Sequence, residues 1–278
     1  MTEILFAPEL VLLRRALLLA ILAAPVLGIV GSLVVTRRIS SLAGASAHTA
    51  LGGVGLALFL QRVCGLTWCS GTVGALIGAV TAAIVVGLVS IYAKEREDTV
   101  IGVVWALGMS IGLLFLDRTP GYVDWQGYLF GNILLIPVPE LWLTGALDLL
   151  VLVLIWCFYN RILAMSFDAV FARLRGIEVN LLYLLLLVLT ALTVVMLIRI
   201  VGIILVIALL TLPGAASGAL TRHLWSMMIV GSVLSWLFIT SGLLASYFLD
   251  LPSGPAVVVI ASVGYLMVLM WKKLHPQV

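Results

Sequence analysis

Residues 179–198 read VNLLYLLLLVLTALTVVMLI and contain no charged side chain. A run of about 20 apolar residues is long enough to cross the hydrocarbon core of a bilayer as a helix. This run is therefore predicted to be a transmembrane helix.

The rest of the chain repeats the pattern. Of its 278 residues 64% are hydrophobic and only 10% are charged, whereas a soluble domain has about 25% charged residues. Nine segments approach spanning length: Ala16–Val35, Ser41–Leu60, Thr67–Ala93, Thr99–Leu116, Leu141–Tyr159, Val179–Ile198, Gly202–Leu220, Trp225–Phe248 and Pro255–Trp271. They predict an all-α integral membrane protein, a polytopic bundle of about nine transmembrane helices in a single domain, residues 1–278.

Two segment boundaries bear on the number of membrane spans. Only a weak break at 199–201 separates the sixth and seventh segments, and Pro213-Gly214 is expected to interrupt the seventh. One long helix followed by a broken one is therefore an alternative over 179–220. The first apolar stretch begins after Arg14-Arg15 and ends at Arg37-Arg38 with no small-residue cleavage site, which predicts a retained helix rather than a signal peptide.

Lys and Arg indicate the orientation, because they concentrate in cytoplasmic loops. We place the Arg37-Arg38 loop in the cytoplasm and let successive loops alternate between the two sides of the membrane. Ten of the 15 basic residues are then cytoplasmic: Arg37, Arg38, Lys94, Arg96, Arg161, Arg173, Arg175, Arg222, Lys272 and Lys273. The N-terminus is then outside and the C-terminus cytoplasmic. The basic residues are scattered singly and in pairs without forming a stripe, so no nucleic-acid partner is predicted.

His48 is the histidine that falls inside a predicted span, where ionisable groups are costly and often functional. Gly44, His48, Gly52 and Gly55 recur at helical spacing and share one face. Small residues there allow another helix to approach closely, or leave room for a cavity. His48 would then line a cation path and ligate a transition metal as neutral imidazole. The alternative is a buried histidine bonded to a neighbouring backbone carbonyl.

Other candidate groups are few. Asp148 in the fifth span would attract cations or, as we favour, hold a helix pair together. Cys64 and Cys69 would form a disulfide in an oxidising compartment, although small apolar residues near the membrane surface are the favoured interpretation. No GxxxxGK[ST] phosphate loop is present, so any ATP that drives transport must bind to a separate polypeptide.

The cytoplasmic stretch Phe167–Gly176 has the pattern of a short amphipathic helix. Asp168 is expected in its first turn, basic residues lie near its end, and Gly176 is placed to stop it. A helix of this kind lies on the lipid surface or docks into a groove of a partner.

Several motifs together resemble a known family, the membrane permeases of bacterial ABC importers for zinc, manganese and iron. The matching stretches follow the family's order: Gly28–Ser40, Ala47–Val54, Asp98–Gly102, Gly127–Leu134, Phe167-Asp168 with Ala172 and Gly176, Val201–Val206 with Leu212–Ala216, and Asp250–Pro255. Seven matches in order cover nearly the whole chain, so the resemblance is specific.

The resemblance implies a type II ABC importer permease fold in the bacterial cytoplasmic (inner) membrane. It implies a second permease copy, ATP-binding ABC subunits, a periplasmic or lipid-anchored metal-binding protein, and a transported divalent metal (Zn, Mn or Fe) with no permanently bound cofactor. The resemblance also makes residues 164–178 the coupling helix, with Phe167, Asp168, Ala172 and Gly176 meeting the ATPase. Asp168, Ala172 and Gly176 would lie on one face.

One position departs from the family. Many members have an aspartate four residues before the histidine, and Gly44 stands there in this chain. The expected metal path therefore consists of His48, as the metal ligand, with Gly44, Gly52 and Asp148. A stand-alone ion-coupled secondary transporter and a membrane subunit without transport are the competing hypotheses.

Overall fold

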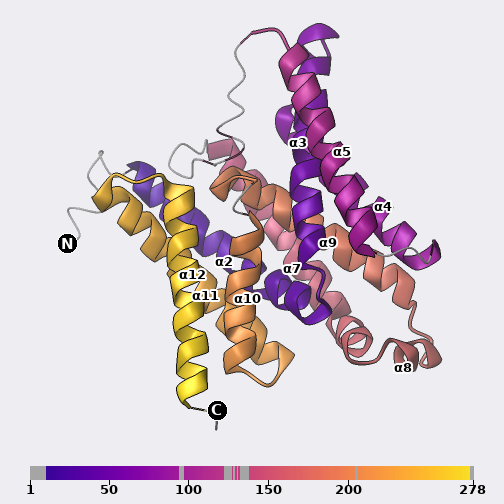
Figure 1. Ribbon diagram of the computed structural model, residues 1–278, viewed down its shortest axis with the longest axis vertical. Coiled ribbons are helices and arrows are strands. Elements are labelled where there is room, and N and C mark those ends of the chain that lie inside the picture. Colours follow the sequence, from indigo (N-terminus) through magenta and orange to yellow (C-terminus); the bar gives the residue numbers. More distant parts are fainter. Residues whose placement is uncertain are drawn as a thin grey trace. The chain divides into compact units, whose positions relative to one another are not determined.

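The computed structural model describes residues 11–93, 97–121, 127, 129, 131, 138–203 and 206–275. Within these residues there are helices and no strands (Figure 1). The helices are α2 (Val11–Arg37), α3 (Ser40–Val63), α4 (Gly71–Tyr92), α5 (Glu97–Arg118), α7 (Val138–Phe167), α8 (Ala169–Leu174), α9 (Val179–Val201), α10 (Val206–Leu220), α11 (Leu224–Leu249) and α12 (Ser253–Leu274). The predicted all-α membrane fold is confirmed.

Eight of the described helices are long and apolar enough to cross a membrane. They correspond to eight of the nine predicted spans. The seventh predicted span is the shorter helix α10, which has 15 residues. It follows a break at Gly202, whose φ of 88° is in the left-handed region that favours glycine. The predicted motif at 127–134 and the loop that carries Lys94 and Arg96 lie mostly outside the described residues.

The prediction that Pro213-Gly214 interrupts the seventh segment is wrong, because α10 continues through both residues. Proline removes one backbone hydrogen bond from a helix, but packing can compensate for that loss. Pro213 is buried, and a Cβ added to Gly214 would lie 2.7 Å from the backbone of Gly31 on α2. Close contact between α10 and α2 therefore supports the helix at this point.

The chain folds as two compact units. The first unit comprises residues 1–38, 130–152 and 199–278, and the second comprises 39–129 and 153–198. Helix α7 contributes its first half to the first unit and its second half to the second. A single domain over 1–278 stays a prediction.

In the first unit, α2 packs against α10 and α11, and α12 packs against α10 and α11 (Figure 1). Glycines carry these contacts. Gly28 of α2 lies against the backbone of Ser232 on α11, and Ser232 Oγ donates a hydrogen bond to the Pro25 carbonyl at 3.3 Å. Small residues at helix crossings let backbones approach in a membrane, where packing rather than the hydrophobic effect holds helices together.

In the second unit, α3 packs against both α4 and α5 (Figure 1). A Cβ at Gly52 of α3 would lie 2.6 Å from the carbonyl oxygen of Gly108 on α5, and one at Gly78 of α4 would lie 2.5 Å from the Thr49 carbonyl. Gly55 meets Gly112 of α5 in the same way. The sequence prediction that this glycine face allows close approach of another helix is confirmed.

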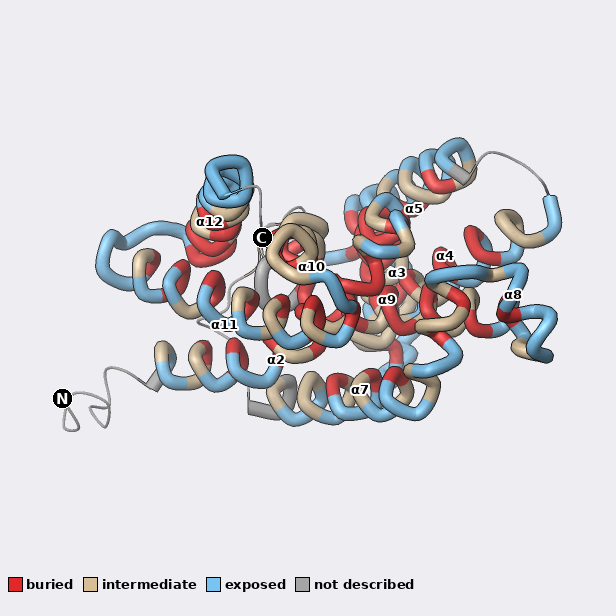
Figure 2. The backbone as a smooth tube through the Cα atoms, turned by 90° about the horizontal axis from the view of Figure 1, so that it is seen from below, coloured by how far each residue is buried: buried red, intermediate tan, exposed pale blue. Residues whose placement is uncertain are grey.

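Helix α7 exposes large apolar side chains, as a helix that faces lipid does. In Figure 2 most of α7 is pale blue or tan, with few buried residues. The exposed residues on α7 include Trp142, Leu149 and Trp156. Such a helix exposes its apolar side to hydrocarbon instead of water.

Candidate functional site

His48 lies on α3 and is only 9% exposed. Its Nδ1 lies 2.9 Å from the carbonyl oxygen of Gly44, one turn earlier. A carbonyl oxygen only accepts hydrogen bonds, so Nδ1 is the donor. In the neutral ring the lone pair is then on Nε2, and Nε2 is the nitrogen that can ligate a metal. The backbone hydrogen bond named as the alternative exists, and it fixes the orientation of the ring.

Trp105 of α5 covers one face of the imidazole. The two ring centroids are 4.3 Å apart and the planes are inclined by 30°. The residues next to this ring pair also connect α3 and α5. Thr49, which follows His48, donates a hydrogen bond from Oγ1 to the carbonyl of Val104, which precedes Trp105, at 3.2 Å. Trp105 was missed in the sequence. The available signal was a tryptophan in the middle of a span, away from the interface where tryptophan is usually found.

Gly44 and Gly52 lie one turn on either side of His48 on the same helix, and both are buried. Gly44 supplies a backbone carbonyl to the imidazole where a carboxylate is expected from the family resemblance. Gly52 holds α5 close to α3. Among the described residues no three His, Cys, Asp or Glu side chains gather as a metal site. His48 therefore stands as a single imidazole beside backbone and an aromatic ring.

Asp148 lies on α7 and is 4% exposed. Its Oδ2 is buried and has no hydrogen-bond partner among the described residues. It shares the buried stripe of α7 with Val151 and Ile155, at i+3 and i+7. Asp148 belongs to the first unit and His48 to the second.

Cys64 and Cys69 are both free thiols, the first exposed and the second buried. The disulfide named as an alternative is not formed in this structure.

The segment predicted to be the coupling helix, residues 164–178, is not a single helix. Helix α7 continues to Phe167, and a separate short helix, α8, spans Ala169–Leu174. Asp168 is the N-cap of α8, one position before the first turn in which it was predicted. It accepts hydrogen bonds from the backbone N–H groups of Val170 and Phe171, both at 2.9 Å.

Gly176 ends this segment, as predicted. Its φ is 75°, and its N–H donates to the Arg173 carbonyl at 2.9 Å. The Ile177 N–H donates to the Ala172 carbonyl at 3.1 Å. Such a pair of bonds around a left-handed glycine is a common way to satisfy the last carbonyls of a helix.

Large apolar side chains are exposed on α8 and at the end of α7, beside the exposed Arg173. Four of them form what we call the apolar face of α8: Phe167, the last residue of α7, with Val170, Phe171 and Leu174 of α8. Leu174 is 82% exposed, whereas Ala172 is completely buried. The Arg175 guanidinium lies over the Phe171 ring at 5.0 Å. Of the four predicted contact residues, Phe167 is therefore accessible, Asp168 and Gly176 shape the segment, and Ala172 is turned inward.

Comparison with known proteins places this architecture in a family. The sequence model of the ABC 3 transport family matches residues 9–272. An uncharacterized membrane protein of Synechocystis sp. is 40% identical, covering 94% of this chain and 91% of that protein. A probable metal transport system membrane protein of Chlamydia muridarum is 36% identical, covering 94% and 89%. The manganese transport system membrane protein MntC of Halalkalibacterium halodurans is 31% identical, covering 90% and 84%.

A solved structure of PsaBC from Streptococcus pneumoniae in complex with Fab has the same fold, with a TM-score of 0.82, 28% sequence identity and 95% of both chains covered. The chain is a multi-pass membrane protein, and its sequence matches these relatives over nearly their whole length. It therefore belongs to the ABC 3 transport family, as a permease and not an enzyme.

Proposed function

We propose that this chain is the permease subunit of an importer that moves a divalent transition metal across the bacterial cytoplasmic membrane. The observation that carries the proposal is its whole-length similarity to relatives named for metal and manganese transport. Manganese is the first cargo to test because of those names, followed by zinc and iron.

ATP would be hydrolysed by separate subunits, since the sequence has no phosphate loop. A second permease copy and a periplasmic or lipid-anchored metal-binding protein would complete the transporter. The positive-inside rule supports an outside N-terminus and a cytoplasmic C-terminus. The match to the ABC 3 transport family supports an ABC importer over the alternative of a stand-alone ion-coupled transporter.

His48 is proposed to contact the metal during transit through Nε2. Its Nδ1 bond to the Gly44 carbonyl holds the ring in one orientation, and hydrogen bonds of this kind tune metal-ligating histidines. A single imidazole binds a metal more weakly than a complete ligand set, which suits a site that must release its cargo. Asp148 is proposed as a second cation-attracting group, because its buried Oδ2 has no partner in the part of the chain that the structure describes.

The apolar face of α8 is proposed to dock into a groove on the ATPase subunit. Exposed phenylalanine and leucine side chains at a helix surface are typical anchors for a groove of this kind. The Asp168 cap and Gly176 would keep the helix short and correctly oriented. The segment therefore combines an apolar contact surface with a shape that is fixed by local hydrogen bonds.

Replacing both Phe171 and Leu174 by aspartate should abolish co-purification of the ATPase subunit. Each change places a carboxylate in the docking surface, where it would be buried without a partner. Both side chains are exposed, at 52% and 82%, so the permease itself should still fold. The measurement is the amount of ATPase retained on the tagged permease.

The matched control is Phe171→Leu with Leu174→Met, which keeps the surface apolar and should retain the ATPase. Ala172→Asp makes a different comparison. Because Ala172 is buried, this variant should destabilise α8 instead of only its contact. ATPase retention by the double aspartate variant would exclude the apolar face of α8 as the docking surface.

A further inference from the structure

One end of the first unit carries five Lys and Arg residues and no acidic residue. The residues are Arg37 and Arg38 at the end of α2, Arg222 in the turn after α10, and Lys272 and Lys273 in the last turn of α12. The stretches 34–38, 221–226 and 270–275 contain neither Asp nor Glu. Arg38, Arg222, Lys272 and Lys273 are exposed, and we call these four residues the basic rim.

Helix packing brings these residues to the same end of the unit. Gly242 of α11 faces Val257 of α12, and Gly264 of α12 faces Phe238 of α11, so the two helices are antiparallel. Continued along the helices, this register brings the end of α12 level with the start of α11. Thr36 Oγ1 lies 3.7 Å from Met227 Sδ, which joins the last turn of α2 to the first turn of α11.

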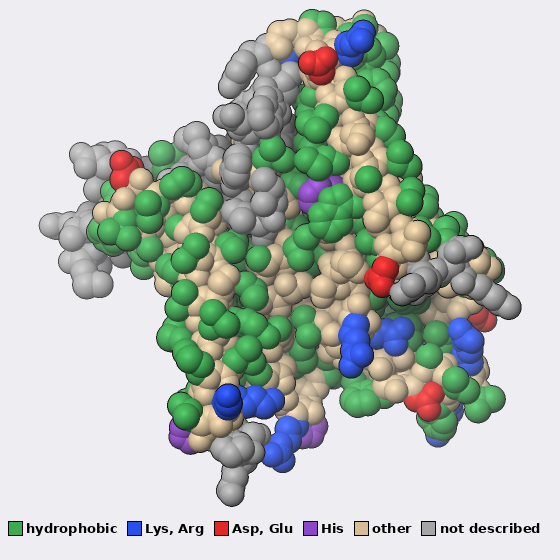
Figure 3. All heavy atoms as spheres, viewed as in Figure 1, with side chains coloured by type: hydrophobic (Ala, Val, Ile, Leu, Met, Phe, Trp, Pro, Cys, Tyr) green, Lys and Arg blue, Asp and Glu red, His purple; other side chains and the backbone are tan. Residues whose placement is uncertain are grey.

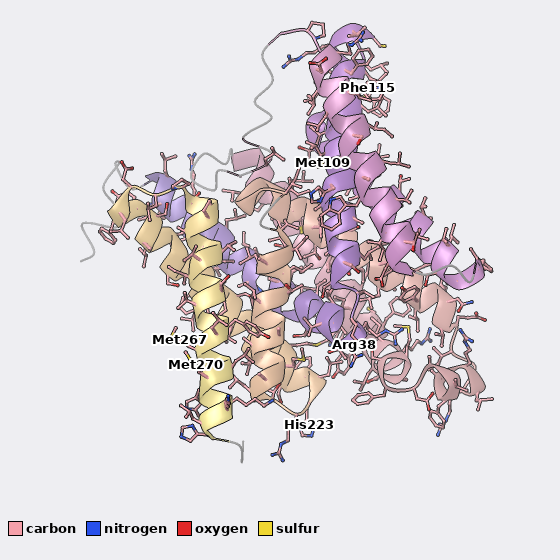
Figure 4. All side chains as sticks on the ribbon, viewed as in Figure 1. Arg38, Met109, Phe115, His223, Met267 and Met270 are labelled. Atoms are coloured by element: carbon pink, nitrogen blue, oxygen red, sulfur yellow. The ribbon has the colours of Figure 1, made fainter. Side chains whose placement is uncertain are left out.

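The figures show the part of this grouping that lies around α11 and α12. In Figure 4, Met267 and Met270 lie in the lower half of α12, and His223 lies near the bottom of the view, toward the lower end of that helix. Figure 3 shows blue and purple side chains gathered at this end of α12, with no red among them. By contrast, the segment that contains α8 mixes Arg173 and Arg175 with Asp168 and Glu178.

Two tryptophans fix the depth of the basic rim in the membrane. Trp225 in the first turn of α11 is 55% exposed, and Trp271 in the last turn of α12 is 45% exposed. Tryptophan is enriched where the hydrocarbon core meets the lipid headgroups. Leu266, Met267 and Met270, one to two turns before the end of α12, are exposed as well and suit the hydrocarbon. The lysines therefore lie at the level of the lipid phosphates.

We propose that the basic rim binds the headgroups of anionic phospholipids. The lysines can extend their charged ends to the phosphate level while their stems stay along the apolar helix. A basic residue near an anionic membrane surface is worth about 1 kcal/mol, and several together select anionic over zwitterionic lipid. An acidic protein partner fits less well, because the flanking tryptophans and methionines of α12 suit lipid.

The test uses the assembled transporter in nanodiscs of phosphatidylcholine, alone or with about 30% phosphatidylglycerol, a content that gives the bilayer a negative surface potential. Native mass spectrometry counts the phosphatidylglycerol molecules that each protein retains. Lys272→Gln with Lys273→Gln should weaken their retention by about 30-fold, and Lys272→Arg with Lys273→Arg should preserve it. The matched control is Arg14→Gln with Arg15→Gln, because this pair lies in the first turns of α2, at the opposite end of the same unit.

Raising the salt to about 0.5 M should weaken retention by the unmodified protein, because salt screens exposed charges. This arm needs no substitution and so is independent of folding. Three results would overturn the proposal: equal retention by the unmodified and glutamine proteins, an equal loss in the Arg14 and Arg15 control, or loss of a protein subunit with lipid retention unchanged. The first would leave these charges with only an orienting role, and the third would assign them to a protein partner.

Discussion

His48→Ala is expected to reduce metal uptake by at least about tenfold, a typical cost of disturbing a metal site. The substitution removes Nε2, the ring nitrogen that can ligate a metal when Nδ1 donates to the Gly44 carbonyl. The effect should appear in uptake and in metal-stimulated ATP hydrolysis, while basal ATP hydrolysis and assembly stay unchanged. Radioactive manganese uptake into reconstituted vesicles measures the first, and phosphate release measures the others.

His223→Ala is the matched control, because this exposed histidine precedes α11 and its side chain makes no capping hydrogen bond. It should transport normally. Asp148→Asn in the same assay separates two roles for the buried carboxyl. Reduced uptake by a stably folded protein would support a place on the cation path, whereas normal uptake would limit Asp148 to packing. Unchanged uptake by His48→Ala would remove His48 from the mechanism.

Gly112→Leu is expected to prevent correct packing of the second unit. A Cβ at Gly112 would lie 2.7 Å from the Leu51 carbonyl oxygen and 2.8 Å from the Gly52 nitrogen, both backbone atoms of α3. Backbone cannot rotate away as a long side chain can, so α5 would have to separate from α3. The cost should be at least about 3 kcal/mol, the upper end of ordinary overpacking. The readout is the monodisperse fraction and the unfolding temperature in detergent.

Gly102→Leu provides a control on the same helix. Apart from its chain neighbours and the adjoining backbone of α5, no described atom lies within 4 Å of a Cβ added at Gly102, which is exposed. This change should leave the fold intact, and replacing an unpacked helical glycine can even add about 0.5 kcal/mol of stability. If the two leucine variants unfold at the same temperature, close packing of α5 on α3 does not support the second unit.

The transmembrane helices were predictable because length and apolar character are local properties of the sequence. Close approach of another helix to the glycine face of α3 could also be predicted, since helical spacing alone aligns Gly52 and Gly55. The identity of the neighbour could not. Trp105 reaches His48 only because α5 packs in one particular register, and no single-helix pattern contains that register.

The α8 segment shows the same division. The Gly176 stop follows from local backbone chemistry and was predicted, and Asp168 lies one position before its predicted place in the first turn, as the N-cap. Which side of α8 faces inward depends on the rest of the chain, and the buried Ala172 and exposed Leu174 were not predicted. At Pro213, packing of α10 on α2 outweighs the tendency of proline to break a helix, so the prediction from the local sequence is wrong.

The most direct test of the account is uptake of manganese into vesicles that hold the permease, its ATPase subunit and its metal-binding protein. We expect saturable uptake that requires ATP on the cytoplasmic side and stops when the ATPase subunit is left out. Uptake that runs on an ion gradient in vesicles containing the permease alone would contradict the account.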